Sequence, residues 1–158
     1  MLELKNPHSV LAALETRAGD VIEVRFGDRS PRGAWQEVSD LAKSLGVPVR
    51  TGRMGGAAAG RGRRDKRGDK DRSGGRTAAA SASVRERSDV GLDQLLSTAG
   101  GDRHGIWLAL DRLQDPHNIG AIFRTAAFFG VRGVLLTTDQ SAPISSAAYD
   151  VASGGLEH

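Results

Sequence analysis

The sequence predicts a mixed α/β protein with two parts, a small N-terminal α/β domain and the first part of a parallel sheet. The first fifty residues alternate between helical and strand patterns. A glycine-rich, strongly basic stretch follows, in which apolar residues show neither helical nor strand spacing. From residue 106 onward, strand, helix and strand follow one another with the lengths of a βαβ unit. We therefore expect a first domain at 1–88, a linker at 89–104 and a partial second domain at 105–158.

The first helix is expected to begin at Asn6, as N-cap, with Pro7 at its first position. Its apolar face is supplied by Val10, Leu11 and Leu14, and the stretch Ala18-Gly19-Asp20 ends it. Residues 21–26, VIEVRF, alternate apolar and charged side chains, as a half-buried strand does.

Helical spacing returns from Trp35 to Leu45, and Gly46 is placed to end that helix. Residues 47–50, VPVR, then form a short extended segment. The stretch ASASVRE, around Ala82 to Glu86, is expected to add one more strand, and GLDQLL a short helical turn. Glycines and charges between residues 99 and 105 indicate a hinge before the second domain.

The basic residues are concentrated in one stretch. Between Arg50 and Arg87 there are twelve Lys and Arg against four Asp and Glu, an excess of +8, whereas the rest of the chain sums to −5. We expect a disordered loop at 51–77, because this stretch combines glycine with charge and lacks aromatics. It is either an arm that binds RNA phosphates or a solvated insertion with no partner. The RNA-backbone contacts expected in the first case are Arg61, Arg63, Arg64, Lys66 and Arg67.

The second part opens with IWLAL, residues 106–110, an apolar run typical of a strand covered on both faces. An amphipathic helix follows, with Asn118 as the expected N-cap and Gly130 as the stop. Residues 133–137, GVLLT, are the next strand, and a last helix begins near Ser145.

The helix at 118–129 begins beyond the carboxyl end of the first strand, where open parallel sheets bind ligands. Gly120 costs about 1 kcal/mol of helix propensity relative to alanine, which suggests a close approach to its backbone. Arg124 follows one turn later, so both residues are expected to face the same space. The alternative is that Asp115 and Pro116 only turn the chain, Asn118 only caps the helix and Arg124 is a solvated charge.

The string DPHNIGAIFRTAAFFGVRGVLL resembles the first signature of the SpoU (TrmH-like) family of RNA ribose 2′-O-methyltransferases. Its D-P-x-N-x-G-A-x-x-R-[ST]-A core matches from Asp115 to Ala126 without a gap. The N-terminal part is similar to that family's ribosomal-protein-like RNA-binding domain, and the layout is closest to rRNA guanosine methyltransferases. The last residues resemble the family's S-x-G-A-x-E at Gly154 and Glu157, with Gly155 in place of the alanine. The resemblance implies a SPOUT, or α/β-knot, fold for the second domain.

The resemblance implies methyl transfer from S-adenosylmethionine to a ribose 2′-hydroxyl of RNA, with rRNA or tRNA as the substrate. Arg124 and Asn118 match the catalytic positions, and substrate contacts are expected from Asp115, Gly120 and Glu157. A free guanidinium has a pKa above about 12, so it is a poor base. Arg124 either accepts a proton in a strongly perturbed state or binds a phosphate and stabilises the developing alkoxide, and we favour the second. Glu157 is an RNA contact or a solvated charge.

The family's second and third signatures build the S-adenosylmethionine pocket and a trefoil knot, and nothing between Met1 and His158 matches them. We therefore expect the knot-forming half to be absent, no cofactor-binding residue in this chain, and weak or no S-adenosylmethionine binding. For a complete protein, the resemblance implies a homodimer. The alternative function is an RNA-binding module without catalysis; a generic nucleotide-binding domain is disfavoured, because no glycine-rich phosphate motif is present.

Further classes are excluded by composition. The chain has no cysteine, and its four histidines have no ligand spacing, so we expect no metal. No apolar run approaches the length of a membrane span, and the N-terminus does not resemble a signal peptide. The cytoplasm is the expected compartment.

Overall fold

The computed structural model of the chain describes residues 1–28, 30–52, 80–98 and 105–158. The predicted loop at 51–77 lies almost entirely outside these residues, and so do its five expected RNA-contact residues. Only its first two residues are described, and Thr51 belongs to a strand. Within the described ranges, no helix combines the length and the apolar character that crossing a membrane requires.

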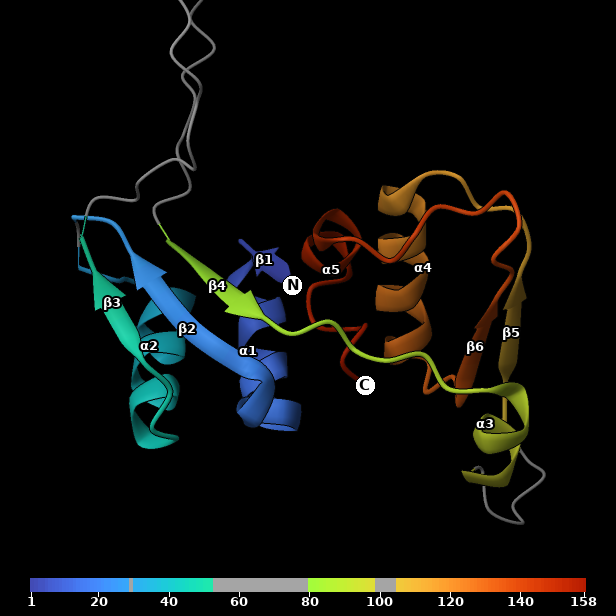
Figure 1. Ribbon diagram of the computed structural model, residues 1–158, viewed down its shortest axis with the longest axis horizontal. Coiled ribbons are helices and arrows are strands. Elements are labelled where there is room, and N and C mark those ends of the chain that lie inside the picture. The colour runs from blue at the N-terminus through green and yellow to red at the C-terminus, as the bar shows by residue number, and fades with distance from the viewer. Residues whose placement is uncertain (29, 53–79, 99–104) are drawn as a thin grey trace, which may run out of the picture.

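The N-terminal part is a four-stranded sheet with two helices (Figure 1). In chain order it contains β1 (Leu2–Leu4), α1 (Pro7–Arg17), a 3₁₀ turn (Ala18–Asp20), β2 (Val21–Phe26), α2 (Ala34–Ser44), β3 (Val49–Thr51) and β4 (Ala80–Val84). The strand order is β1-β4-β2-β3. Because α2 carries the chain back along the sheet, β2 and β3 are parallel, whereas β4 pairs antiparallel with both of its neighbours.

The predicted N-terminal elements are confirmed, with small shifts at their ends. The side chain of Asn6 accepts a hydrogen bond from the His8 amide, so Asn6 is the N-cap of α1 as expected. In β2, Val24 and Phe26 are buried and Arg25 is exposed, as the alternation predicts. The alternation is wrong in the first half of the strand, where Ile22 is exposed and Glu23 is buried, because the pairing with β4 shifts register between Val21 and Glu23. The strand β1 was not predicted, because three residues are too few to show a period.

The short helix α3 (Leu92–Thr98) lies in the stretch predicted as the linker, where a helical turn was expected. The second part consists of β5 (Trp107–Leu110), α4 (Pro116–Phe128), β6 (Gly133–Leu136) and α5 (Ser146–Ala152). The strands β5 and β6 form a parallel pair, as the βαβ pattern predicts. Their side chains are mostly half-buried, although the apolar run IWLAL indicated a strand covered on both faces. The pair has no further strand beside it among the described residues.

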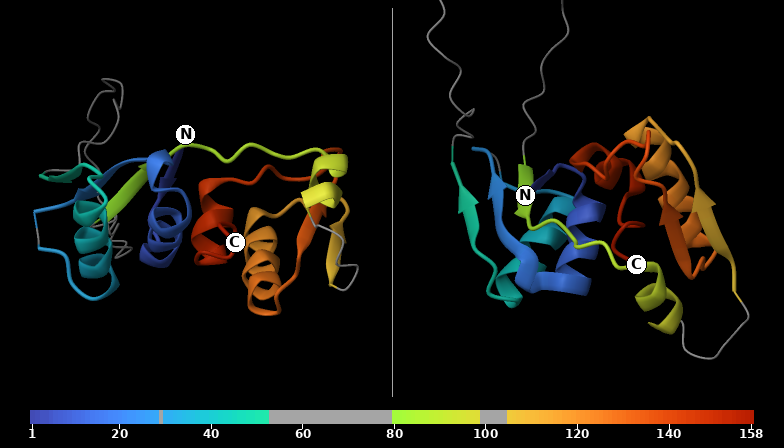
Figure 2. Two further views of the ribbon diagram at one scale, coloured as in Figure 1. Left: turned by 90° about the horizontal axis from the view of Figure 1, so that it is seen from below. Right: turned by 45° about the vertical axis from the view of Figure 1, so that its right-hand side comes forward.

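The two parts share one hydrophobic core through α5. Figure 2 shows α2, α1, α5 and α4 side by side, with β5 and β6 beyond α4. Core residues of α1 such as Val10 and Leu14 belong to the same buried cluster as Tyr149 and Ala152 of α5 and Ile119 of α4. The helix α5 is therefore packed against the N-terminal part on one side and against α4 on the other.

Candidate functional site

The helix α4 begins at Pro116, three residues earlier than the expected first helical residue, Ile119. Asp115, not Asn118, is its N-cap, and the Asp115 carboxylate accepts a hydrogen bond from the His117 amide at 2.8 Å. The prediction of Asn118 as the cap is thus wrong. Aspartate caps helices as well as asparagine does, and Pro116 supplies the φ angle favoured at the first position. Asn118 instead lies in the first turn of the helix.

Gly120 lies where α4 packs closely against α5. It is buried, and a Cβ atom added to it would lie 2.4 Å from the carbonyl oxygen of Ala148 and 2.8 Å from Cβ of Val151. The expected close approach to this glycine is confirmed, but the approaching group is a neighbouring helix. Gly120 therefore sets the distance between α4 and α5, which leaves no room at its backbone for a substrate in this arrangement.

Arg124 lies one turn after Gly120 and also faces α5. Its Nη1 donates a hydrogen bond to the carbonyl oxygen of Val151 at 3.3 Å, and the residue is exposed. This carbonyl belongs to the last turn of α5, whose unpaired oxygens attract cations. The guanidinium therefore rests on the end of α5, and its remaining donors are open to a ligand.

Asn118 is not beside Arg124. The two residues are six positions apart on one helix, which separates them by about 120° around its axis. Asn118 is exposed, and no hydrogen bond joins its side chain to any residue of the described ranges. Of the two expected catalytic residues, the structure thus attaches Arg124 to α5 and leaves Asn118 on a separate, solvent-facing side.

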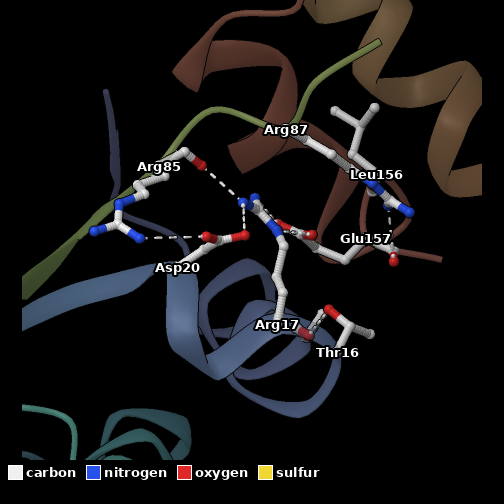
Figure 3. A network of polar contacts seen from close by, with 8 residues as sticks. Thr16, Arg17, Asp20, Arg85, Arg87, Leu156 and Glu157 are labelled. Atoms are coloured by element: carbon white, nitrogen blue, oxygen red, sulfur yellow. Dashed lines mark hydrogen bonds and ion pairs between the residues drawn. The ribbon is translucent and has the colours of Figure 1, made fainter. Parts of the chain in front are cut away.

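Glu157 forms a two-point ion pair with Arg17 of α1 (Figure 3). Its Oε2 accepts from Nε at 2.6 Å and its Oε1 accepts from Nη2 at 2.7 Å. The side chain of Glu157 has no exposed surface, so the alternative of a solvated charge is wrong. Both oxygens are engaged, so a direct contact with RNA is not compatible with this arrangement.

The surroundings of this ion pair shift two pKa values. The hydrogen bond to Glu157 raises the pKa of Arg17 above its usual value, against the opposing effect of burial. Burial raises the pKa of Tyr149, and the negative charge of Glu157 raises it further. Both shifts keep the present protonation states at neutral pH, with Arg17 charged and the Tyr149 hydroxyl neutral.

Sequence reasoning missed Arg17, Asn6 and Arg87, which hold α5 and the turn after it. Asn6 appears only as a helix cap in the sequence, and Arg17 only as a basic residue in a last helical turn, which is common. Their partners lie about 70 to 150 positions away. A pattern of neighbouring residues in the sequence cannot indicate a pairing over such a distance.

An apolar groove of about 420 Å³ lies on another face of α4, between this helix and β5. Ile122, Phe129 and Leu108 are among its lining residues, and Thr125 is the single polar one. The Thr125 hydroxyl donates to the carbonyl oxygen of Ala121. The groove therefore offers almost no polar group to a ligand such as S-adenosylmethionine, which carries charged and hydroxyl groups.

Comparison with known proteins assigns the second part of the chain. Residues 105–158 match the SpoU rRNA Methylase family. The chain is 31% identical over 153 residues to the 23S rRNA (guanosine-2′-O-)-methyltransferase RlmB of Xylella fastidiosa. The aligned region covers 95% of this chain and 56% of that protein. It is 46% identical over 66 residues to RlmB of Acinetobacter baylyi. Residues 105–158 of the chain belong to the SpoU family.

Solved structures of SpoU proteins have the same fold over nearly the whole chain. The SpoU methyltransferase AviRb from Streptomyces viridochromogenes matches with a TM-score of 0.65 at 16% identity, covering 99% of this chain and 50% of AviRb. An AdoMet-bound rRNA methyltransferase from Sinorhizobium meliloti matches with a TM-score of 0.61 at 18% identity. At these identities the likeness concerns the fold alone. The chain spans little more than half the length of the curated relatives that match it from end to end.

The chain departs from the SpoU pattern at Gly155, and the structure supplies a physical reason. A Cβ atom at this position would lie 2.8 Å from Cα of Arg124 and 2.8 Å from the carbonyl oxygen of Phe123. Because these are backbone atoms of α4, they cannot move aside easily. The glycine thus allows the turn after α5 to lie directly against the residue expected to be catalytic.

Proposed function

We propose that this chain is the RNA-binding and ribose-positioning part of a SpoU ribose 2′-O-methyltransferase that acts on rRNA. The observation that carries the proposal is the place of Arg124. Its guanidinium is exposed on the first helix of the family-matched segment, and a hydrogen bond to Val151 holds it. The substrate class comes from relatives whose names state 23S rRNA guanosine-2′-O-methylation.

Arg124 would act on the RNA as a fixed cation. A planar guanidinium can bind a phosphate through two parallel N–H donors, which orients the neighbouring ribose. Loss of the 2′-hydroxyl proton places negative charge on the oxygen, and a cation already in place stabilises that charge. This role requires no change in the protonation of Arg124. Asn118 and Asp115, both exposed near the start of α4, would contact the same RNA segment.

The methyl donor of this reaction in SpoU relatives is S-adenosylmethionine, which one solved structure names as its cofactor. The groove beside α4 does not fit that cofactor, because its lining is almost wholly apolar. We therefore place the cofactor site in the portion of the relatives that this chain does not span.

The 158-residue chain is expected to bind a 23S rRNA fragment and to show no measurable affinity for S-adenosylmethionine. Isothermal titration calorimetry with each ligand tests both expectations. Micromolar binding of the cofactor would contradict this. The same chain, joined to the C-terminal portion of the Xylella fastidiosa relative, is expected to produce 2′-O-methylguanosine in that RNA, detected by mass spectrometry of its nucleosides. The separate C-terminal portion is the control for activity carried by the added segment.

A second candidate function is RNA binding without catalysis. The apolar lining of the groove beside α4 favours it for this chain taken alone. The two functions differ in the outcome for the joined protein. An RNA-binding module would still bind the fragment after the fusion, but it would leave the ribose unmethylated even though a cofactor-binding portion is present.

A further inference from the structure

The turn after α5 is attached to the N-terminal part by a buried charge pair. The side chain of Glu157 has no exposed surface and that of Arg17 is 12% exposed. Burying two charges is unfavourable unless their hydrogen bonds are satisfied. Here they are, because the third nitrogen of Arg17, Nη1, donates to the carbonyl oxygen of Arg85 at 2.7 Å (Figure 3). Because every charged group of the pair has hydrogen-bond partners, this contact is a specific feature of the fold.

The opposite end of α1 holds the same segment. The backbone amides of Lys5 and Asn6 both donate to Oδ1 of Asp150, at 2.8 and 2.9 Å. The Asn6 side chain donates to the carbonyl oxygen of Asp150 and to the hydroxyl of Ser153. Residues 149–157, which we term the docking segment, are therefore attached to both ends of α1.

Between these two ends, α1 and the docking segment are in direct contact. The Ser9 hydroxyl donates to the carbonyl oxygen of Tyr149 at 2.6 Å in a buried position. Gly154 has a positive φ of 97°, and a Cβ atom there would lie 3.0 Å from Cβ of Ala12. Arg87, which follows β4, donates to the backbone carbonyl oxygen of Glu157 at 3.1 Å. The contact is thus continuous along the helix.

The other side of the docking segment carries Arg124. Val151 accepts the hydrogen bond from its guanidinium, and Gly155 lies against its backbone. A continuous series of contacts therefore runs from Arg17, through Glu157 and the docking segment, to Arg124. Any movement of the docking segment relative to α1 would move the support of the Arg124 side chain.

We propose that Arg17 is a positioning residue, which fixes Arg124 relative to the N-terminal sheet by holding Glu157. The docking itself is independent of what the chain binds, whereas its use in presenting RNA rests on the proposed function. An RNA that contacts both parts of the chain binds best when the distance between these parts is already fixed. The docking fixes this distance before binding, so no conformational entropy is lost in ordering the two parts when RNA binds. Arg17 itself is too buried to be a main RNA contact.

The docking is tested by the distance between two spin labels in the 158-residue chain. The chain has no cysteine, so Lys43→Cys on α2 and Phe128→Cys on α4, both exposed, take one label each. Double electron–electron resonance is expected to give one narrow distance distribution. Arg17→Ala and Glu157→Gln should each broaden it, and Arg17→Lys, which keeps the charge but loses the planar fork, should broaden it less. Arg25→Ala is the control, because it removes an ion pair with Glu23 on β2.

A distribution unchanged in Arg17→Ala would overturn the proposal, provided that circular dichroism shows the variant folded. If Arg17→Ala does not fold, Arg17→Lys and Glu157→Gln decide by the same measure, and unchanged distributions in both would overturn it equally.

The use in RNA binding is tested by affinity for the 23S rRNA fragment. Arg17→Ala should weaken binding by about fivefold or more, and it should have no further effect once Arg124 is replaced by alanine. The positioning role would be overturned if Arg17→Ala weakened RNA binding equally in the unsubstituted chain and in the Arg124→Ala variant. If the unsubstituted chain bound no RNA, the proposed function and the RNA role would fall together, and the spin-label distances would still decide the docking.

Discussion

Replacing Arg124 with lysine is expected to lower methyl transfer by roughly 10²-fold in the chain completed with the C-terminal portion of its Xylella fastidiosa relative. Lysine keeps the positive charge but carries it as a point on a flexible stem, so it cannot bind a phosphate through two parallel donors. Lysine also has only one ammonium group, so it cannot donate to the Val151 carbonyl oxygen and present two parallel donors to a phosphate at the same time. The measurement is the turnover of the 23S rRNA fragment at saturating cofactor.

RNA affinity should change much less, within a few-fold, because charge dominates attraction to the RNA backbone and lysine retains it. Arg25→Lys is the matched control, since Arg25 pairs with Glu23 on a strand remote from α4. Equal losses of turnover and of RNA affinity in Arg124→Lys would contradict the catalytic role. They would indicate that Arg124 is one binding residue among several.

Gly120→Ala is expected to destabilise the folded chain by about 1–3 kcal/mol, even though alanine is favoured over glycine in helices by about 1 kcal/mol. The added methyl would lie 2.4 Å from a backbone carbonyl oxygen of α5, which has no rotamer to change. The helices α4 and α5 would have to separate. The change is measured as a lower midpoint of urea unfolding with an unaltered slope.

Gly19→Ala provides the comparison, because a Cβ atom at Gly19 meets nothing within 4 Å. If Gly120→Ala were as stable as Gly19→Ala, the close packing of α4 on α5 would be wrong. The support of Arg124 by Val151 would then lose its structural basis, because both contacts belong to the same helix pair.

Local patterns in the sequence predicted most of the fold. The alternation in residues 21–26 placed β2, and Asn6-Pro7 placed the start of α1, because these signals come from neighbouring residues. The start of α4 was misplaced because two residues able to cap, Asp115 and Asn118, stand close together, and only the geometry shows which one accepts the amide. The strand β1 depends on pairing with β4, some eighty residues away.

The candidate site was predictable in part. The signature indicated Arg124 and Gly120, and both lie at the packed junction of α4 and α5. The ion pair of Arg17 and Glu157 was not predictable, since its members are 140 positions apart and each resembles an ordinary surface charge in the sequence. Packing of the N-terminal part on α5 buries the pair and gives it a role. Such long-range contacts are properties of the fold, which no window of neighbouring residues contains.

The central claim is that the guanidinium of Arg124 meets the sugar-phosphate of a bound RNA. Titration of the ¹⁵N-labelled 158-residue chain with the 23S rRNA fragment, followed through the arginine Nε–Hε signals, tests it most directly. The Arg124 signal, assigned by its loss in Arg124→Lys, is expected to shift saturably at the same RNA concentration that saturates binding. RNA binding that saturates while the Arg124 signal stays unchanged would contradict the claim.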